Sequence, residues 1–181
     1  MTTLTFERCP ISLEGVEDRT AIDLVEVAFS NLANLDGLQA LPCLRTLRVH
    51  YCRRLSDISA LEGLSKLADV TFYSTPRLSD YGALARIKSL ESIELNGPYR
   101  VDSIRPFQNL PRLKHLALSR VKVNDGDYTP ILENTAIQEV FWYGAPFKPP
   151  ALSEIKRQRP DLLIGGNSAF DAKRATKLSA A

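Results

Sequence analysis

The chain has 181 residues, of which 44% are hydrophobic and 24% charged, as expected for one globular domain rather than a disordered segment. Its 23 basic and 21 acidic residues give a formal net charge of +2, which is too balanced to favour a nucleic acid or an anionic membrane as partner. No apolar run is long enough for a membrane-spanning helix. Three cysteines (Cys9, Cys43 and Cys52) indicate free thiols in a reducing compartment. The first residues lack a signal-peptide pattern, so we expect a cytoplasmic protein.

Residues 1–21 are expected to form a degenerate opening repeat. Leu4 and Phe6 stand 21 residues before Val25 and Val27, so the segment TLTFE is predicted to be a first strand. Charged residues interrupt the part that follows, as is typical where the end of a stack of repeats faces water. We therefore predict an N-terminal capping repeat over residues 1–21.

Residues 22–162 are predicted to contain six repeats of 22–25 residues. Apolar side chains recur through the segment that starts at Leu44, at Leu47, Val49, Leu55, Ile58, Leu61 and Leu64. The same pattern returns after 23 residues from Leu67, and again after 23 from Leu90. The repeats that start at Ile22, Leu113 and Ile137 have 22, 24 and 25 residues. A fixed period in this range indicates a solenoid.

Each repeat is expected to hold one short strand and one return arc. Within the strand the apolar residues point into the solenoid and their neighbours point outward, because side chains alternate across a strand. In the arc apolar residues occur at every third position, a spacing that favours a short 3₁₀ or irregular turn over a long α-helix. Polar residues suited to helix capping precede the arcs at equivalent positions, namely Asn34, Asp57, Asp80 and Ser103.

The segment PPALSEIKRQRP predicts a capping helix near residues 150–159. Prolines bracket it, with Pro149 and Pro150 at its start and Pro160 at its end. We expect Leu152 and Ile155 to cover the last repeat.

The segment DLLIGG follows and predicts a terminal strand over residues 163–166, with either Leu163 or Ile164 packed inward. Residues 167–181 are small and basic, and we expect them to form a flexible tail.

The segment LSDISALEGLSKL, from Leu55 to Leu67, resembles the conserved arc of leucine-rich repeat proteins. The similar class has repeats of 22–23 residues and includes bacterial internalins and a nuclear phosphatase-regulator subunit. The resemblance extends over roughly residues 22–165. It implies an α/β solenoid, a right-handed superhelix with a parallel β-sheet on its concave face and short 3₁₀ or irregular arcs on its convex face.

The chain also departs from that family. The family carries Asn or Cys where the chain leaves the strand; Cys52 fits, whereas Thr75 and Pro98 do not, so we expect an incomplete hydrogen-bond ladder there. Secreted internalins bring a signal peptide and a wall anchor, and neither pattern is present. The departure argues against a surface adhesin.

The strand face is the expected binding surface. The central outward positions are predicted to be Glu26, Arg48, Thr71, Glu94, Ala117 and Phe141. The following outward positions are Ala28, His50, Tyr73, Asn96, Ser119 and Tyr143. The preceding outward positions are Leu24, Thr46, Asp69, Ser92, His115 and Glu139. One position past each strand lie Phe29, Tyr51, Ser74, Gly97, Arg120 and Gly144.

Exposed aromatic and arginine side chains dominate interface energetics, and a solvated face does not need them. The alternative is that tyrosines simply favour strands. The predicted partner-binding residues are Glu26, Arg48, His50, Tyr51, Tyr73, Glu94, Asn96, His115, Arg120, Phe141 and Tyr143.

Adjoining loops are expected to form an arginine-rich edge that could meet an acidic partner, although a solvated rim is the simpler interpretation of each residue taken singly. This edge consists of Arg53, Arg54, Arg77, Tyr99 and Arg100.

No catalytic or metal pattern stands out. Cys43, His50 and Cys52 lie close in sequence, but the spacing matches no zinc motif, and a buried free cysteine is the expected state of Cys52. The segment NDGD (Asn124 to Asp127) lacks the distal Glu of a calcium loop and is predicted to be a turn. We expect no enzyme activity, cofactor or metal.

The sequence thus predicts a non-catalytic module that binds one protein through its concave face and its arginine and tyrosine edge. An inhibitor, an adaptor, a phosphatase-regulator-like subunit, an immunity protein or a delivered effector would suit that description. The alternatives are a self-associating structural unit, in which a second copy is the partner, and an RNA-binding module that uses the basic edge.

Overall fold

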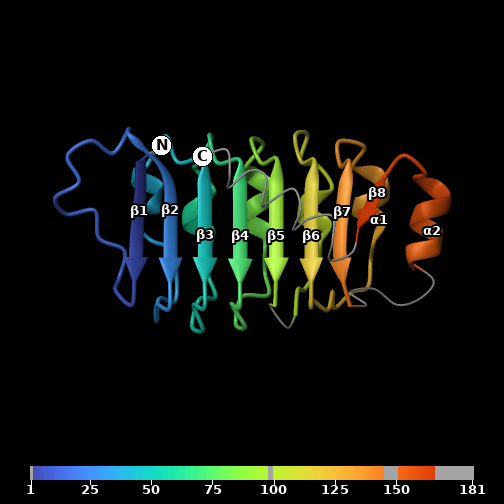
Figure 1. Ribbon diagram of the computed structural model, residues 1–181, viewed down its shortest axis with the longest axis horizontal. Helices are drawn as coiled ribbons and strands as arrows, with labels where there is room; N and C mark the ends of the chain where they lie inside the picture. The colour runs from blue at the N-terminus through green and yellow to red at the C-terminus, as the bar shows by residue number, and fades with distance from the viewer. Residues whose placement is uncertain (1, 98–99, 145–150, 166–181) are drawn as a thin grey trace.

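The structure is a computed structural model that describes residues 2–97, 100–144 and 151–165. Eight strands lie side by side in chain order and every neighbouring pair is parallel (Figure 1). Their bounds are β1 Thr2–Glu7, β2 Ile22–Ala28, β3 Thr46–His50, β4 Asp69–Tyr73, β5 Ser92–Asn96, β6 His115–Ser119, β7 Glu139–Tyr143 and β8 Leu163–Gly165.

The register of the sheet gives offsets of 22, 23, 23, 23, 24 and 24 residues from β2 to β8, so the last offset is 24 where a repeat of 25 residues was expected. Leu24 pairs with Thr46, Thr46 with Asp69, and Asp69 with Ser92, which are offsets of 22, 23 and 23 residues. In β3, β4 and β5 two buried apolar residues alternate with three partly exposed outward ones, and in β5 the buried pair is Ile93 and Leu95. At the first strand Leu4 pairs with Val25 and Phe6 with Val27, so TLTFE is a strand as predicted.

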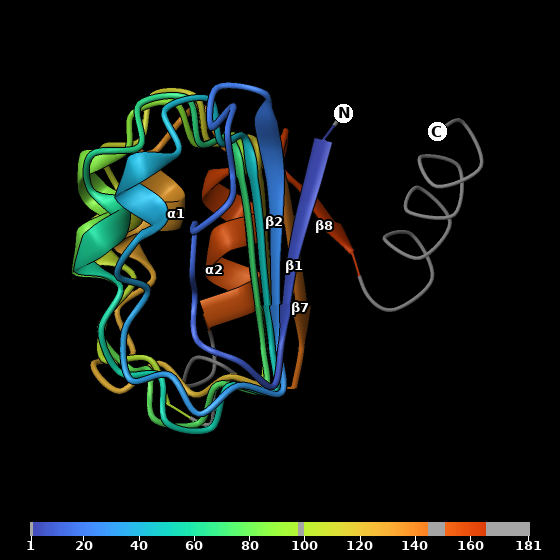
Figure 2. The ribbon, with the colours of Figure 1, turned by 90° about the vertical axis from the view of Figure 1, so that its left-hand side faces the viewer.

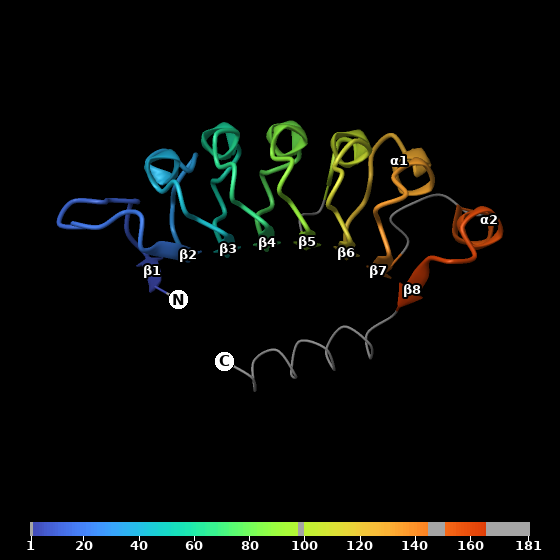
Figure 3. The same ribbon diagram turned by 90° about the horizontal axis from the view of Figure 1, so that it is seen from above.

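Four of the return arcs contain 3₁₀ helices, as the spacing of three predicts. These are η1 Leu38–Ala40, η2 Ser59–Leu61, η3 Gly82–Arg86 and η4 Arg105–Phe107. The arc of the 24-residue repeat instead forms a short α-helix, α1 Thr129–Glu133. The arcs form the outer side of a gentle curve and the sheet its inner, concave side (Figure 3).

Three of the four expected capping residues satisfy the first amide of their arc, and each of these stands one position before the formal cap. Asn34 does not: it stands three positions before the cap Gly37 and accepts from the Asp36 N–H. Asp57 and Asp80 accept hydrogen bonds from the backbone N–H of Ser59 at 2.8 Å and of Gly82 at 2.7 Å. Ser103 accepts one in the same way from Arg105. These three side chains therefore fold the chain into the turns that begin their arcs.

The sheet and the arcs form two layers (Figure 2), and the buried apolar side chains pack together between them. The buried strand residues meet the apolar arc residues of their own and of neighbouring repeats, so no repeat has a core of its own. Where the chain leaves each strand one residue turns back into this space, and Ser30, Cys52, Thr75 and Val121 are all buried. The Ser30 hydroxyl donates to the Cys9 carbonyl at 3.0 Å, whereas Thr75 and Val121 provide no such link, as expected for an incomplete ladder.

At the C-terminal end, helix α2 (Ala151–Gln158) packs Ile155 into the core. The expectation for Leu152 was wrong: its side chain is exposed, because Ile155 occupies the inward position of this short helix. In β8, Leu163 is exposed and Ile164 packs against the core. Ile164 is therefore the inward residue of the terminal strand.

Several expectations fall on residues outside the described ranges, namely those for Pro98, Tyr99, Pro149, Pro150 and the segment 167–181. Among the described residues, no helix is long and apolar enough to cross a membrane.

Candidate binding surface on the strand face

The sheet register places the predicted outward residues in continuous rows. Glu26, Arg48, Thr71 and Glu94 are successive partners in the central row. The next row joins His50, Tyr73 and Asn96 in the same way, and all of these side chains are partly exposed. The expected order of residues along the strand face is confirmed, whereas their role in binding stays a prediction.

Four predicted outward residues are buried, and one of them is Ala117, which retains 2% exposure. Phe141 retains 8% exposure, Glu139 6% and Leu24 3%. Phe141 lies in register between Ala117 and Gly165, and these small neighbours leave room for its ring to lie close against the sheet. Phe141 therefore offers little area to a partner, and the expectation that it is an exposed contact was wrong.

Polar side chains on the face pair along the rows. The Glu26 carboxylate lies 3.8 Å from His50 Nε2, and the Thr71 hydroxyl donates to Glu94 at 3.5 Å. His115 Nδ1 lies 3.1 Å from the largely buried Glu139 carboxylate. These contacts hold the side chains in place.

An aromatic ladder formed by Phe29, Tyr51 and Tyr73 runs along the edge of the face at the ends of β2, β3 and β4. The rings of Phe29 and Tyr51 are stacked, with centroids 4.8 Å apart and an interplanar angle of 8°. Tyr51 meets Tyr73 edge-on at 5.0 Å. Interaction with the Tyr73 hydroxyl raises the pKa of Tyr51 above its ordinary value. Phe29 and Tyr51 nevertheless stay 51% and 40% exposed, so the ladder presents apolar area to solvent.

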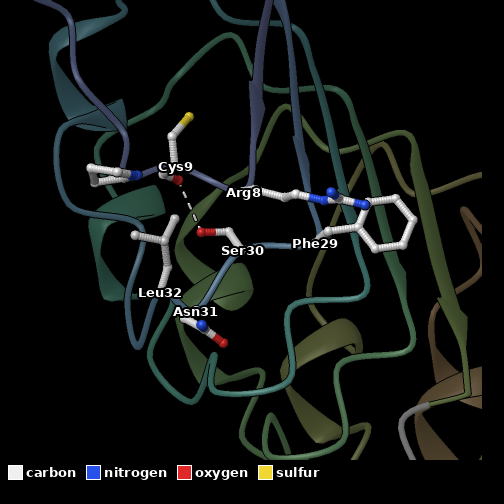
Figure 4. A pocket seen from close by; sticks show the side chains of 7 residues that line it. Arg8, Cys9, Phe29, Ser30, Asn31 and Leu32 are labelled. Carbon is white, nitrogen blue, oxygen red and sulfur yellow. Dashed lines mark hydrogen bonds between the residues drawn. The ribbon is translucent and has the colours of Figure 1, made fainter.

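Arg8 extends the ladder at its N-terminal end. Its guanidinium carbon lies 5.9 Å from the centre of the Phe29 ring, within the range of a cation–π contact. Figure 4 shows the Arg8 side chain reaching toward the Phe29 ring, beside the turn in which Ser30 donates to the Cys9 carbonyl. The four side chains Arg8, Phe29, Tyr51 and Tyr73 form one continuous ridge.

The backbone of this ridge is unusual. Arg8, Phe29 and Tyr51 follow directly on their strands with φ of 57°, 52° and 56°, the left-handed region that bulky residues rarely adopt. Ser74 and Arg120 repeat this at 54° and 53°. Glycine would fit such positions without strain, as it does at Gly97 and Gly144. Strained backbone is found mostly at functional positions, which draws attention to the side chains carried there.

Two shallow depressions flank the ridge. One, of about 250 Å³, lies on the strand face and is lined by His50, Tyr51, Thr71, Tyr73, Glu94 and Asn96. The other, of about 480 Å³, lies beyond Phe29 and is lined by Arg8, Cys9, Pro10, Phe29, Ser30, Asn31 and Leu32 (Figure 4). Such open hollows suit the side chains of a protein partner better than an enclosed small molecule.

Within the described ranges, no group of three His, Cys, Asp or Glu side chains is placed to hold a metal ion. Cys52 is buried and burial raises the pKa of its thiol, while Cys43 accepts a contact from Lys66 Nζ at 3.3 Å. In NDGD, the Asp125 and Asp127 carboxylates accept backbone amides two residues on, so the segment is a turn as predicted.

The structure brings together five predicted residues, His50, Tyr51, Tyr73, Glu94 and Asn96, around one depression. Tyr143 lies apart from them on β7 and is exposed. Phe29 and Arg8 were missing from the predicted set. The signal for both was their offset: each follows directly on its strand, and Arg8 precedes Phe29 by 21 residues, the spacing of the first repeat.

No family description and no curated protein matches the chain. Among solved structures, an internalin (inlF) from Listeria monocytogenes matches with a TM-score of 0.50 and 22% identity, over 68% of this chain and 42% of that one. A leucine-rich repeat protein of Leptospira interrogans matches with a TM-score of 0.44 and 12% identity, over 92% of this chain and 54% of that one. The chain thus spans about half the length of these proteins. The internalin match and the parallel sheet with its 3₁₀ arcs establish a leucine-rich repeat solenoid.

Proposed function

We propose that the protein is a non-catalytic binding module that engages one protein partner through its concave strand face and its arginine and tyrosine edge. It would act by occupying a surface of that partner, as an inhibitor, an adaptor or an immunity-type protein does. The three free cysteines support a reducing compartment, and we place the protein in the cytoplasm.

The exposed ridge of Arg8, Phe29, Tyr51 and Tyr73 carries the proposal. Aromatic and arginine side chains supply most of the binding energy at protein interfaces. Stacking between the rings fixes their geometry before a partner arrives, which lowers the entropy lost on binding. A purely structural role would be better served by glycine at the left-handed positions.

The dimensions of the sheet support a protein partner. Eight strands spaced about 4.8 Å apart give a face roughly 34 Å long. A standard interface takes about 800 Å² from each partner, and a strand face only about three outward residues wide falls short of that, so we expect the adjoining turns to contribute. A partner that spans both would contact the aromatic ladder and the arginine-rich edge together.

Self-association is the second candidate, because β1 forms the end of the described sheet and its outer side pairs with no described strand. Unpaired strand edges are templates for another chain. Light scattering over a concentration series separates the two proposals, since a monomer throughout the series contradicts self-association. RNA binding by the basic edge is the third, and its affinity would fall steeply with salt.

The direct test is affinity capture from the native cell extract with three immobilised proteins. These are the wild type, the variant Arg48→Ala/Tyr73→Ala on the strand face, and the control Gln39→Ala/Arg86→Ala on the outer arcs. We expect the wild type and the control to retain one protein in stoichiometric amount and the strand-face variant to lose it. Retention by all three, or by none, would contradict binding through the strand face.

A further inference from the structure

Six cations gather on the four turns that follow β3, β4, β5 and β6. All six side chains are exposed. They are Arg53, Arg54, Arg77, Arg100, Arg120 and Lys122, called here the turn cations. The turns lie together at the arrowhead ends of these strands in Figure 1.

The repeat stacks three of the turn cations on one another. Arg54, Arg77 and Arg100 are separated by 23 residues each, the length of the repeat, so they occupy equivalent places on adjacent turns. Neighbouring strands lie about 4.8 Å apart, which brings three like charges into one short row. Such a row repels itself unless an anion lies against it.

The described part of the chain does not neutralise this row. Among the described residues, none of the turn cations takes part in an ion pair or donates a side-chain hydrogen bond. Cations elsewhere are paired: Lys114 lies 2.9 Å from the Glu91 carboxylate and Arg105 lies 3.0 Å from that of Asp127.

Acidic residues do follow the turns, but their carboxylates accept hydrogen bonds from the return arcs and the neighbouring turns. Asp57 accepts the Ser59 amide, which lowers the pKa of its carboxyl, and Asp80 accepts the Gly82 amide. Asp102 accepts hydrogen bonds from Ser79 at 2.8 Å and Asn124 at 2.9 Å. The anions on this side of the molecule thus hold its fold together, and the turn cations remain available.

The identity of the turn cations indicates what they bind. Five of the six are arginines, whose planar guanidinium forms paired hydrogen bonds with a carboxylate or a phosphate. A phosphate backbone carries negative charge along its whole length and would also meet the carboxylates of Glu26 and Glu94 on the adjacent strand face, whereas a short acidic segment can pair with the turn cations alone. The aromatic ladder on the same edge supplies apolar contact, which a protein segment uses readily. Together these features favour an acidic protein over a nucleic acid.

We propose that the turn cations and the aromatic ladder form one docking surface for an acidic segment of the protein partner. Carboxylates of that segment pair with the stacked guanidiniums, and an apolar side chain beside them covers Phe29 and Tyr51. This rests on the proposed function and names the chemistry of the partner. Association should be fast and salt-sensitive, because complementary charge steers the encounter.

The test uses a short fluorescein-labelled peptide of glutamate and alanine, with fluorescence anisotropy as the readout. Three proteins are compared: the wild type, the variant Arg54→Glu/Arg77→Glu/Arg100→Glu, and the control Arg45→Glu/Arg112→Glu/Lys156→Glu. Both variants change the net charge equally, and the control alters exposed cations away from the turns. Melting curves check that each variant is folded.

We expect the wild type to bind the peptide with an affinity that falls as salt rises. The turn variant should lose at least about 100-fold in affinity, since it places like charges opposite each other across the interface. The control should stay within about 3-fold. No binding by the wild type, or an equal loss in the control, would overturn the proposal. Tighter binding of an oligouridine RNA than of the peptide would overturn it in favour of a nucleic acid.

Capture of the native partner keeps this inference distinct from the proposed function. A partner that is lost from Arg48→Ala/Tyr73→Ala but retained by the turn variant would overturn the acidic docking surface and leave the proposed function standing. A peptide bound through the turn cations, with no protein captured through the strand face, would support the acidic docking surface and contradict the proposed function.

Discussion

Replacement of Leu95 by alanine probes the core where it is most enclosed. Leu95 is fully buried in β5, in register between Phe72 and Leu118, both also fully buried. The change removes three carbon atoms, and the lost burial alone amounts to about 2.4 kcal/mol at about 0.8 kcal/mol per methylene. Strands on both sides restrict collapse of the cavity, so we expect a total loss of about 3–5 kcal/mol.

Urea unfolding followed by far-ultraviolet circular dichroism measures this loss. For a chain of this length, the same loss of stability should lower the Tm in a thermal melt by roughly 6–20 °C, at about 2–4 °C per kcal/mol. The slope of the transition should stay unchanged if the solenoid unfolds as one unit. Loss of cooperativity would show instead that the repeats unfold separately.

Ser92→Ala in the same strand and Arg48→Ala in β3 are the matched controls, because both side chains lie on the outward face and are partly exposed. Each should change the unfolding free energy by no more than about 0.5 kcal/mol. A loss below about 1 kcal/mol for Leu95→Ala, or a larger loss for either control, would refute the assigned strand register.

Three further changes test other parts of the structure. Phe29→Gly should keep the unfolding free energy within about 1 kcal/mol of the wild type, because relief of the left-handed strain offsets the loss of stacking. The same change should weaken partner binding in a titration. A large loss of stability would give Phe29 a structural role. Burial raises the pKa of Tyr81 far above its usual range, and its hydroxyl has no well-formed hydrogen bond among the described residues. Tyr81→Phe should therefore leave the free energy of unfolding in urea equal or up to about 1 kcal/mol higher. A clear loss of stability would show that the hydroxyl is bonded. Hydrogen bonds from Thr129, followed by that from Arg105, lower the pKa of Asp127, so its contribution is present above the unfolded pKa of about 3.9 and is lost as the pH falls through the lower folded value. Asp127→Asn should therefore cost at most about 1 kcal/mol at neutral pH and show a shallower loss of stability below about pH 4; an unchanged acid profile would exclude this carboxyl as a contributor.

The sequence predicts the solenoid well because its pattern is periodic. Each buried leucine or valine fixes the face of its strand, and the 23-residue offset then fixes every neighbour, so the row Arg48, Thr71, Glu94 follows from arithmetic. Burial of single outward residues does not follow in this way, since Phe141 depends on the small size of Ala117 and Gly165 across two strand pairs. Spacing predicts the row, not the packing within it.

The ridge of Arg8, Phe29, Tyr51 and Tyr73 was less accessible to sequence reasoning. Spacing places Phe29 and Tyr51 one position past their strands, but only the left-handed backbone turns their rings into a stack. Arg8 belongs to the degenerate first repeat, where too few apolar positions remain to align it with confidence in the pattern. The same limit applies to α2, whose eight residues do not define which of Leu152 and Ile155 faces the core.

Hydrogen exchange of the protein with and without its captured partner tests the central claim most directly, because it maps the contact without altering any residue. We predict slower exchange in β2 to β5 and in the turns after β3 to β6, with no change in the outer arcs η1 to η4. Protection confined to the arcs, or to the free edge of β1, would contradict binding through the strand face.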